Sequence, residues 1–127
     1  MEQFPQRRRV TEYIRDRYAA DAEYLWARYP NYAVFRHPAS RKWFALVMDI
    51  PRDRLGLEGE GNVDIMDMKC GSLMVDSLLA QDGFLPAYHM SKSSWISVLL
   101  DETVPDDQIY TLLELNYDSV APKRKRN

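Results

Sequence analysis

The sequence predicts an α+β fold: a two-layer sandwich in which helices pack on one mainly antiparallel sheet. Segments with the apolar spacing of helices lie near both ends of the chain, and apolar segments of strand length lie between them. Short connections join the first three of these strands, which favours antiparallel pairing. The predicted order is α-β-β-β-α-β-β-α, and 127 residues suit a single domain.

The first half of the chain supplies one helix and three strands. Positions with helical spacing of i, i+3, i+4, i+7 and i+8 are Val10, Tyr13, Ile14, Arg17 and Tyr18. Strands are predicted at residues 32–37, 42–50 and 63–70, with a hairpin turn between the first two. Residues 42–50 are nearly all apolar, so this strand should be central and covered on at least one face.

The second half supplies two helices and two short strands. Residues 71–82 have a helical apolar face, and Gly83 is the predicted C-terminal cap. A short edge strand is predicted at 86–90 and an alternating strand at 94–100. Thr103 and Asp106 resemble a capping pair for the last helix. Its apolar face comprises Ile109, Leu112, Leu113, Tyr117 and Val120.

Charge is distributed unevenly along the chain. The runs Arg7–Arg9 and Lys123–Arg126 supply 7 of the 17 basic residues, which leaves residues 10–122 with 10 basic and 18 acidic residues, a net charge of −8. We expect basic flexible tails at about residues 1–9 and 123–127. A tail that binds a partner is the alternative interpretation.

The chain has the features of a cytoplasmic protein. Residues 1–9 are polar and basic, unlike a secretory signal, and no run approaches the roughly 18 apolar residues of a membrane span. The single cysteine, Cys70, excludes an internal disulfide. We expect a cytoplasmic monomer without a membrane partner.

Cys70 is the one candidate nucleophile of a thiol enzyme. Lys69 and a predicted helix N-terminus favour its thiolate, and His37 or His89 could act as the base. However, Cys70 is in phase with two methionines on one strand face, which indicates a buried and inert thiol. We therefore expect a structural role for Cys70.

Metal and phosphate sites are not indicated. Asp64 and Asp67 alternate imperfectly along a strand, and the sequence has no cluster of Cys and His with the spacing of metal ligands. The glycine-rich residues 56–61 contain Glu58 and Glu60, which would repel phosphate. We expect no cofactor, no metal and no enzymatic activity.

Three groups of residues form a recognisable pattern. Residues 32–37 read Tyr-Ala-Val-Phe-Arg-His and are followed by Lys-Trp-Phe-Ala at 42–45, while Met-Lys-Cys at 68–70 precedes the middle helix. The third group is Pro-Ala-Tyr-His-Met-Ser-Lys at 86–92, then Trp-Ile-Ser-Val at 95–98, and a last helix that starts at Pro105 and ends in Asn116 and Tyr117. Over about residues 10–122 this pattern resembles the MmcQ/YjbR family.

The resemblance implies a secretion-chaperone-like, frataxin-reminiscent α+β fold. It also implies DNA binding through two projecting β-hairpins, a "double wing", and it brings no catalytic residues. Gly71 stands where the family pattern has Asp, and Asn116 where it has Ser. Both positions lie outside the proposed wings.

Two segments without acidic residues carry the predicted hairpins. They are residues 28–48 and 83–100, and they contain the residues proposed to contact DNA, which are Arg36, His37, Arg41, Lys42, His89 and Lys92. Basic side chains can contact the DNA backbone, while Trp43 and Trp95 could stack on a base. The alternative is that both tryptophans belong to the core, that His89 is a hydrogen-bonded structural residue, and that the charges are solvated.

The leading functional hypothesis is therefore a non-enzymatic binding module with DNA as its ligand, bound weakly and in a salt-sensitive way. The alternative is a protein-interaction adaptor, or chaperone-like module, in which a sheet face or helix groove takes a peptide. The acidic body fits this alternative better.

Overall fold

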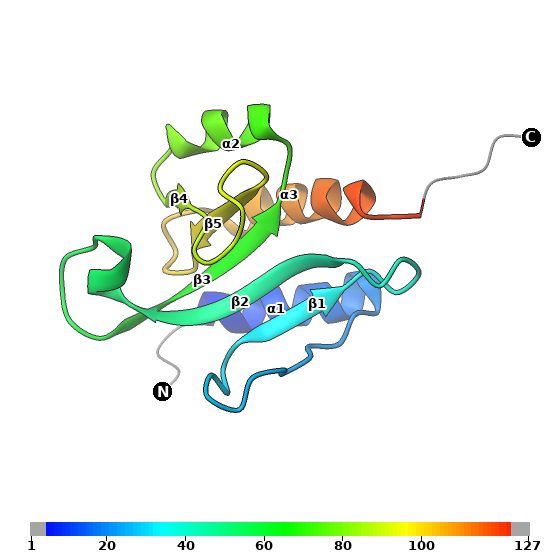
Figure 1. The fold of residues 1–127 in the computed structure, drawn as a ribbon, viewed down its shortest axis with the longest axis horizontal. Coiled ribbons are helices and arrows are strands. Elements are labelled where there is room, and N and C mark those ends of the chain that lie inside the picture. The colour runs from blue at the N-terminus through cyan, green and yellow to red at the C-terminus, as the bar shows by residue number, and fades with distance from the viewer. Residues whose placement is uncertain (1–4, 123–127) are drawn as a thin grey trace, which may run out of the picture.

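The computed structural model describes residues 5–122, and its helices and strands follow the predicted order (Figure 1). They are α1 (Pro5–Tyr18), β1 (Ala33–Arg36), β2 (Trp43–Pro51), the 3₁₀-helix η1 (Arg52–Leu55), β3 (Asn62–Lys69), α2 (Ser72–Leu79), β4 (Phe84–Pro86), β5 (Trp95–Leu99) and α3 (Asp106–Ser119). The prediction of an α+β fold is confirmed.

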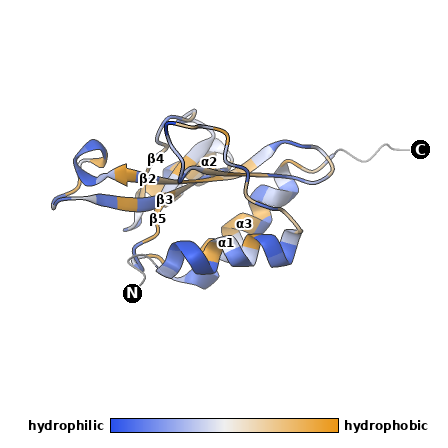
Figure 2. Cartoon of the chain, turned by 90° about the horizontal axis from the view of Figure 1, so that it is seen from below, coloured by the Kyte–Doolittle hydropathy of each residue, from blue (hydrophilic) through white to orange (hydrophobic). Residues whose placement is uncertain are grey.

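The five described strands form one antiparallel sheet in the order β1-β2-β3-β5-β4. Helices α1 and α3 lie side by side across one face of the sheet (Figure 2), while α2 packs beside β4 and β5. The other face is covered in part by the segments between the strands, and we call it the loop-covered face. The central strands β2 and β3 are buried on both faces, as the apolar run in β2 predicts.

Apolar side chains form one cluster on each face of the sheet. On the helix side, Val10 and Ile14 of α1 and Leu113 of α3 pack on alternate residues of the strands. The buried members on the loop-covered face are Val34, Leu46, Met48, Ile50, Val63, Ile65 and Leu99. This second cluster positions the candidate site described below.

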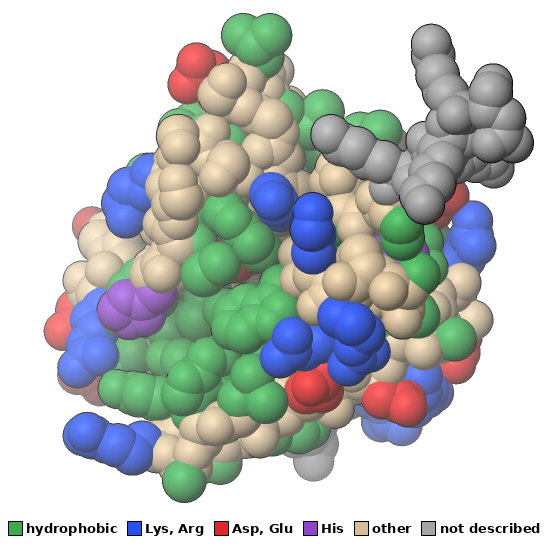
Figure 3. Space-filling view, turned by 45° about the vertical axis from the view of Figure 1, so that its right-hand side comes forward, with side chains coloured by type: hydrophobic (Ala, Val, Ile, Leu, Met, Phe, Trp, Pro, Cys, Tyr) green, Lys and Arg blue, Asp and Glu red, His purple; other side chains and the backbone are tan. Residues whose placement is uncertain are grey.

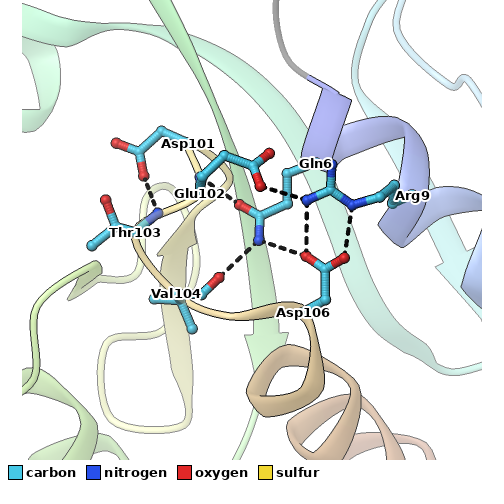
Figure 4. A network of polar contacts seen from close by, with 7 residues as sticks. All are labelled: Gln6, Arg9, Asp101, Glu102, Thr103, Val104 and Asp106. Atoms are coloured by element: carbon cyan, nitrogen blue, oxygen red, sulfur yellow. Dashed lines mark hydrogen bonds and ion pairs between the residues drawn. The ribbon is translucent and has the colours of Figure 1, made fainter.

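The N-terminal arginines are part of the fold. Arg7 lies 3.0 Å from the buried Asp64, and Arg9 pairs with Glu102 at 2.5 Å and with Asp106 at 2.7 Å (Figure 4). The prediction of a flexible segment is therefore wrong for residues 5–9, because acids distant in the sequence neutralise this basic run. Residues 1–4, and the C-terminal tail predicted at 123–127, lie outside the described residues.

Three further local predictions are wrong. The edge strand predicted at 86–90 lies at Phe84–Pro86, where it pairs with β5. Helix α2 ends at Leu79 with Ala80, rather than Gly83, as its C-cap. Thr103 does not cap α3, because its side chain makes no cap bond and its N–H donates to Asp101.

Gly83 is required by a close approach between two loops. Its φ is +90°, and a Cβ atom at this position would lie 2.4 Å from Cγ2 of Val104. We expect Gly83→Ala to lower the free energy of unfolding by about 2–3 kcal/mol, since it combines backbone strain with overpacking. Urea unfolding measures this. Gly61→Ala is the control, because Gly61 has a φ of +83° but open space around it; an equal loss at both positions would contradict the close approach.

Candidate binding site on the loop-covered face

A cavity of about 340 Å³ opens on the loop-covered face. Figure 3 shows this face hollowed among hydrophobic side chains, with Lys and Arg side chains gathered around the hollow. We call the cavity the aromatic pocket, and its lining residues are Trp26, Tyr29, Tyr32, Trp43, Leu46, Met48, His89 and Met90. Its volume lies in the range of about 300–1,000 Å³ that is usual for ligand pockets.

A β-bulge places Trp43 in the aromatic pocket. Ala45 lies opposite Phe35 and Trp43 lies opposite Arg36, so Phe44 is an extra residue on β2. Phe44 and Ala45 both enter the helix-side cluster, whereas Trp43 packs with the cluster on the loop-covered face. Strict alternation would have placed Trp43 on the helix side with Ala45.

The segment before β1 supplies the aromatic wall of the pocket. Glu23 fixes this segment to the sheet by exchanging two backbone hydrogen bonds of 2.9 Å with Val34. The rings of Trp26 and Trp43 meet edge to face at 5.9 Å, and Tyr29 stacks on Tyr32 at 4.7 Å. The wall is therefore a packed set of rings rather than a loose loop.

The opposite wall is the segment between β4 and β5, which folds back over the sheet. The N–H of Tyr88 donates to Ser97 Oγ at 3.0 Å, and Lys92 Nζ donates to the carbonyl of Ala87 at 3.0 Å. His89 has a φ of +64° and lines the pocket together with Met90. Because Tyr88 and Met90 pack on the loop-covered cluster, this hairpin lies on the sheet face.

A buried carboxyl group lies beneath this second wall. The Ser97 hydroxyl donates to Oδ1 of Asp67, which is inaccessible to solvent, and Oδ2 has no hydrogen-bond partner among residues 5–122. Burial raises the pKa of Asp67 to about 7, although the Ser97 hydroxyl, the Tyr88 N–H and Lys92 all act to lower it. The pocket wall thus rests on a carboxyl group that titrates near neutral pH.

Two of the three basic residues predicted to contact DNA on the first hairpin form ion pairs within the protein. Arg36 Nε lies 3.1 Å from Glu23, and the Arg36 guanidinium lies 5.8 Å from the centre of the Trp43 ring. Arg41 lies 3.6 Å from the same Glu23 carboxylate. Lys42 is exposed.

The two histidines have different surroundings. His37 is buried, accepts hydrogen bonds at Nδ1 from the N–H groups of Ala39 and Ser40, and stacks on Tyr117 at 4.3 Å. These contacts give His37 a structural role in the hairpin turn. His89 is exposed at the pocket, and Lys92 is exposed on the same loop. The pocket therefore brings together the two acid-free segments, but of the six predicted contact residues only His89 lines it.

Several pocket residues were not predicted as site residues. Trp26, Tyr29 and Tyr32 place three aromatic rings within seven residues of a segment that is interrupted by Pro30. Aromatic residues in such a segment are the signal that could have found the wall. Trp95, in contrast, is buried as the core interpretation predicts.

Cys70 lies away from the pocket, against the helix-side cluster. Burial raises the pKa of its thiol, which lowers the thiolate population at neutral pH. We expect the folded protein to react with a thiol reagent more slowly than the urea-unfolded chain at the same pH. Faster labelling of the folded state would contradict a structural role.

Neither a metal centre nor a membrane span is found in residues 5–122. This part of the chain has no group of three or more His, Cys, Asp or Glu side chains that could hold a metal ion. None of the helices in the same residues is long and apolar enough to cross a membrane.

Comparisons with known proteins agree on one family. The model of the YjbR family matches residues 10–119. The uncharacterised protein YyaQ of Bacillus subtilis is 38% identical over 108 residues, which cover 85% of this chain and 92% of YyaQ. A crystal structure of a Pseudomonas syringae protein is similar with a TM-score of 0.87 and 36% identity, over 95% of this chain and 100% of that one. A Deinococcus radiodurans structure shares the fold, with a TM-score of 0.63 and 20% identity over 86% of this chain and 76% of that one. This chain belongs to the YjbR family.

Proposed function

We propose that this protein is a non-enzymatic binding module whose aromatic pocket receives a large apolar side chain from a peptide or protein partner. The observation that carries the proposal is the nearly continuous apolar lining of an open pocket. Tyr29 of the pocket is 44% exposed, and Tyr24 and Leu25, which precede Trp26 in the chain, are 61% and 46% exposed. Exposed apolar surface of this kind marks interaction sites.

The residue types of the pocket favour a protein partner. Trp, Tyr, Met and Arg are enriched at protein interfaces, and Trp, Tyr and Arg are enriched among the residues that dominate binding energy. Trp26, Tyr29, Trp43 and Met90 are of these types. The hydrogen bonds and ring contacts of both walls favour a preformed site, which reduces the entropy cost of binding.

Selection of displayed random peptides against the full chain tests this proposal. We expect the selected peptides to share a large apolar residue and to lose about tenfold or more in affinity on Trp43→Ala, measured by calorimetry. Tyr29→Ala is a second variant, because its exposed ring can be removed without opening the core. Leu115→Ala on α3 is the control, since Leu115 is exposed on the opposite side. Failure to select any peptide, or affinity that is indifferent to both pocket variants, would contradict the proposal.

DNA binding is the second candidate, and the meeting of the two acid-free segments at the pocket favours it. Stacking of an unpaired base on Trp43, with phosphates near Arg41 and Lys42, would use this arrangement. The ion pairs of Arg36 and Arg41 with Glu23 compete with phosphate contacts, and an apolar lining leaves the polar edges of a base unpaired.

The DNA candidate predicts a strong dependence on salt. Three to five phosphate contacts would give log affinity against log salt a slope of about −3 to −5. Fluorescence anisotropy with a labelled single strand measures this slope, and Arg41→Ala/Lys42→Ala should make it less steep. Absence of binding at low salt would exclude this candidate.

A further inference from the structure

We infer that the partner segment is acidic, with Asp or Glu residues flanking the apolar side chain that enters the aromatic pocket. This inference rests on the proposed function and adds to it the charge of the partner. It follows from the contrast between the surroundings of the pocket and the rest of the protein.

The two segments that line most of the pocket carry cations and no acids. Residues 28–48 contain four Lys or Arg residues, and residues 83–100 contain Lys92. Residues 5–122 as a whole contain 13 basic and 18 acidic residues, a net charge of −5. The surroundings of the pocket are thus locally cationic on an acidic protein, and Figure 3 shows Lys and Arg side chains around the hollow.

Cations lie beside both walls of the pocket. Arg36 lies next to the Trp43 ring, and Arg41 belongs to the same hairpin. On the other wall, Lys92 is bound to the carbonyl of Ala87, and Arg54 lies beside Tyr88 and Lys92 in an adjoining hollow. An extended segment that crosses the pocket would therefore meet positive charge on both sides of its apolar anchor.

The acidic body does not prevent this attraction. Ion pairs of Glu23 with Arg36 and Arg41 offset part of the local charge, but Lys42 and Lys92 are exposed. At physiological ionic strength, charges more than about 8 Å apart are largely screened, so the local cations dominate at the pocket. Charge complementarity of this kind increases specificity and the rate of association.

The main competing ligand chemistry is a cation held by aromatic rings. Pockets lined by Trp and Tyr bind ammonium groups through cation–π contacts. The cations beside both walls would repel such a ligand. A basic peptide therefore tests whether the pocket prefers cations to acidic segments.

Calorimetry with three synthetic peptides of equal length tests the inference. Each has a central Phe, flanked by Asp and Glu, by Ser, or by Lys. We expect the full-length protein to bind the acidic peptide most tightly and the basic one most weakly, with about a tenfold difference between them at low salt. Arg41→Glu/Lys42→Glu should abolish this difference. Arg15→Glu/Arg17→Glu changes the net charge equally at exposed positions of α1 and should preserve it.

The outcomes distinguish a failure of the acidic-partner inference from a failure of the proposed binding function. Equal affinity for all three peptides, or tighter binding of the basic peptide, would overturn the acidic partner while leaving the binding module in place. A preference that survives the Arg41/Lys42 reversal would also overturn it. No binding of any of the three peptides would overturn both the acidic partner and the proposed peptide-binding function. This result would be clearest if an oligonucleotide bound and its binding required Trp43.

Discussion

Asp67→Asn is expected to raise the free energy of unfolding by about 2–4 kcal/mol at pH 8 and to leave it nearly unchanged at pH 4. The Asp67 side chain is fully buried, and Oδ2 lacks a hydrogen-bond partner in the described chain. At pH 8 the native state therefore holds a buried carboxylate with incomplete compensation. Asn keeps the acceptor for Ser97 and removes the charge.

The direction of the pH dependence follows from the raised pKa. Burial places the pKa of Asp67 at about 7 in the native state, against about 3.9 in an unfolded chain. Between these values the native state retains a proton that the unfolded state has lost, so the contribution of Asp67 to stability falls as pH rises from about 4 to about 7. Above pH 7 the penalty is constant.

Urea unfolding of both proteins across pH 4–8 measures the effect. The difference between the variant and the wild type isolates Asp67, because the other titrating groups are common to both. Asp76→Asn on α2 is the control, since Asp76 is exposed and a surface change should stay within about 0.5 kcal/mol at every pH. The same difference at pH 4 and pH 8 would contradict a buried, titrating Asp67.

Gln6→Ala is expected to lower the free energy of unfolding by about 3–5 kcal/mol, because it leaves the Val104 carbonyl and the Glu102 N–H without this partner and opens a cavity at a buried site. Gln6 Nε2 donates to the Val104 carbonyl at 2.8 Å and to Asp106 at 2.9 Å, and its Oε1 accepts the Glu102 N–H at 2.8 Å (Figure 4). A single buried side chain thus joins α1 to the loop before α3.

Thermal and urea unfolding test this expectation. Gln81→Ala is the control, because Gln81 is exposed and bonds Gln108 at the surface. That variant should change stability by no more than about 0.5 kcal/mol. Equal effects of the two substitutions would show that the α1–α3 connection contributes little.

The fold was predictable because its signals are local. Val10 and Ile14 on α1 and Leu112 and Leu113 on α3 are spaced so that each helix has one apolar face, and the apolar run of β2 indicates a central strand. The extent of α1 was not predictable from such signals. In the sequence its arginines resemble a solvated tail, because their partners Asp64, Glu102 and Asp106 are distant along the chain and come close only in the folded protein.

The pocket was only partly predictable. The two acid-free segments are visible in the sequence, and both reach the site. The bulge at Phe44 is not visible in the sequence, and it moves Trp43 to the pocket from the helix side, where strict alternation along β2 would place it. His37 was predicted to contact DNA from the hairpin but does not belong to the site. Its ring accepts a hydrogen bond within the turn and stacks on Tyr117.

An NMR titration of the full chain with the acidic Phe peptide shows directly whether the aromatic pocket binds it. We expect amide shift changes that centre on residues 26–32, 43–48 and 88–92, with the indole N–H signals of Trp26 and Trp43 among the largest. Signals of α1 and α3 should remain unchanged, because these helices cover the opposite face of the sheet. Changes centred on α1 and α3, or confined to the tip at residues 37–42, would show that the aromatic pocket is not the binding site.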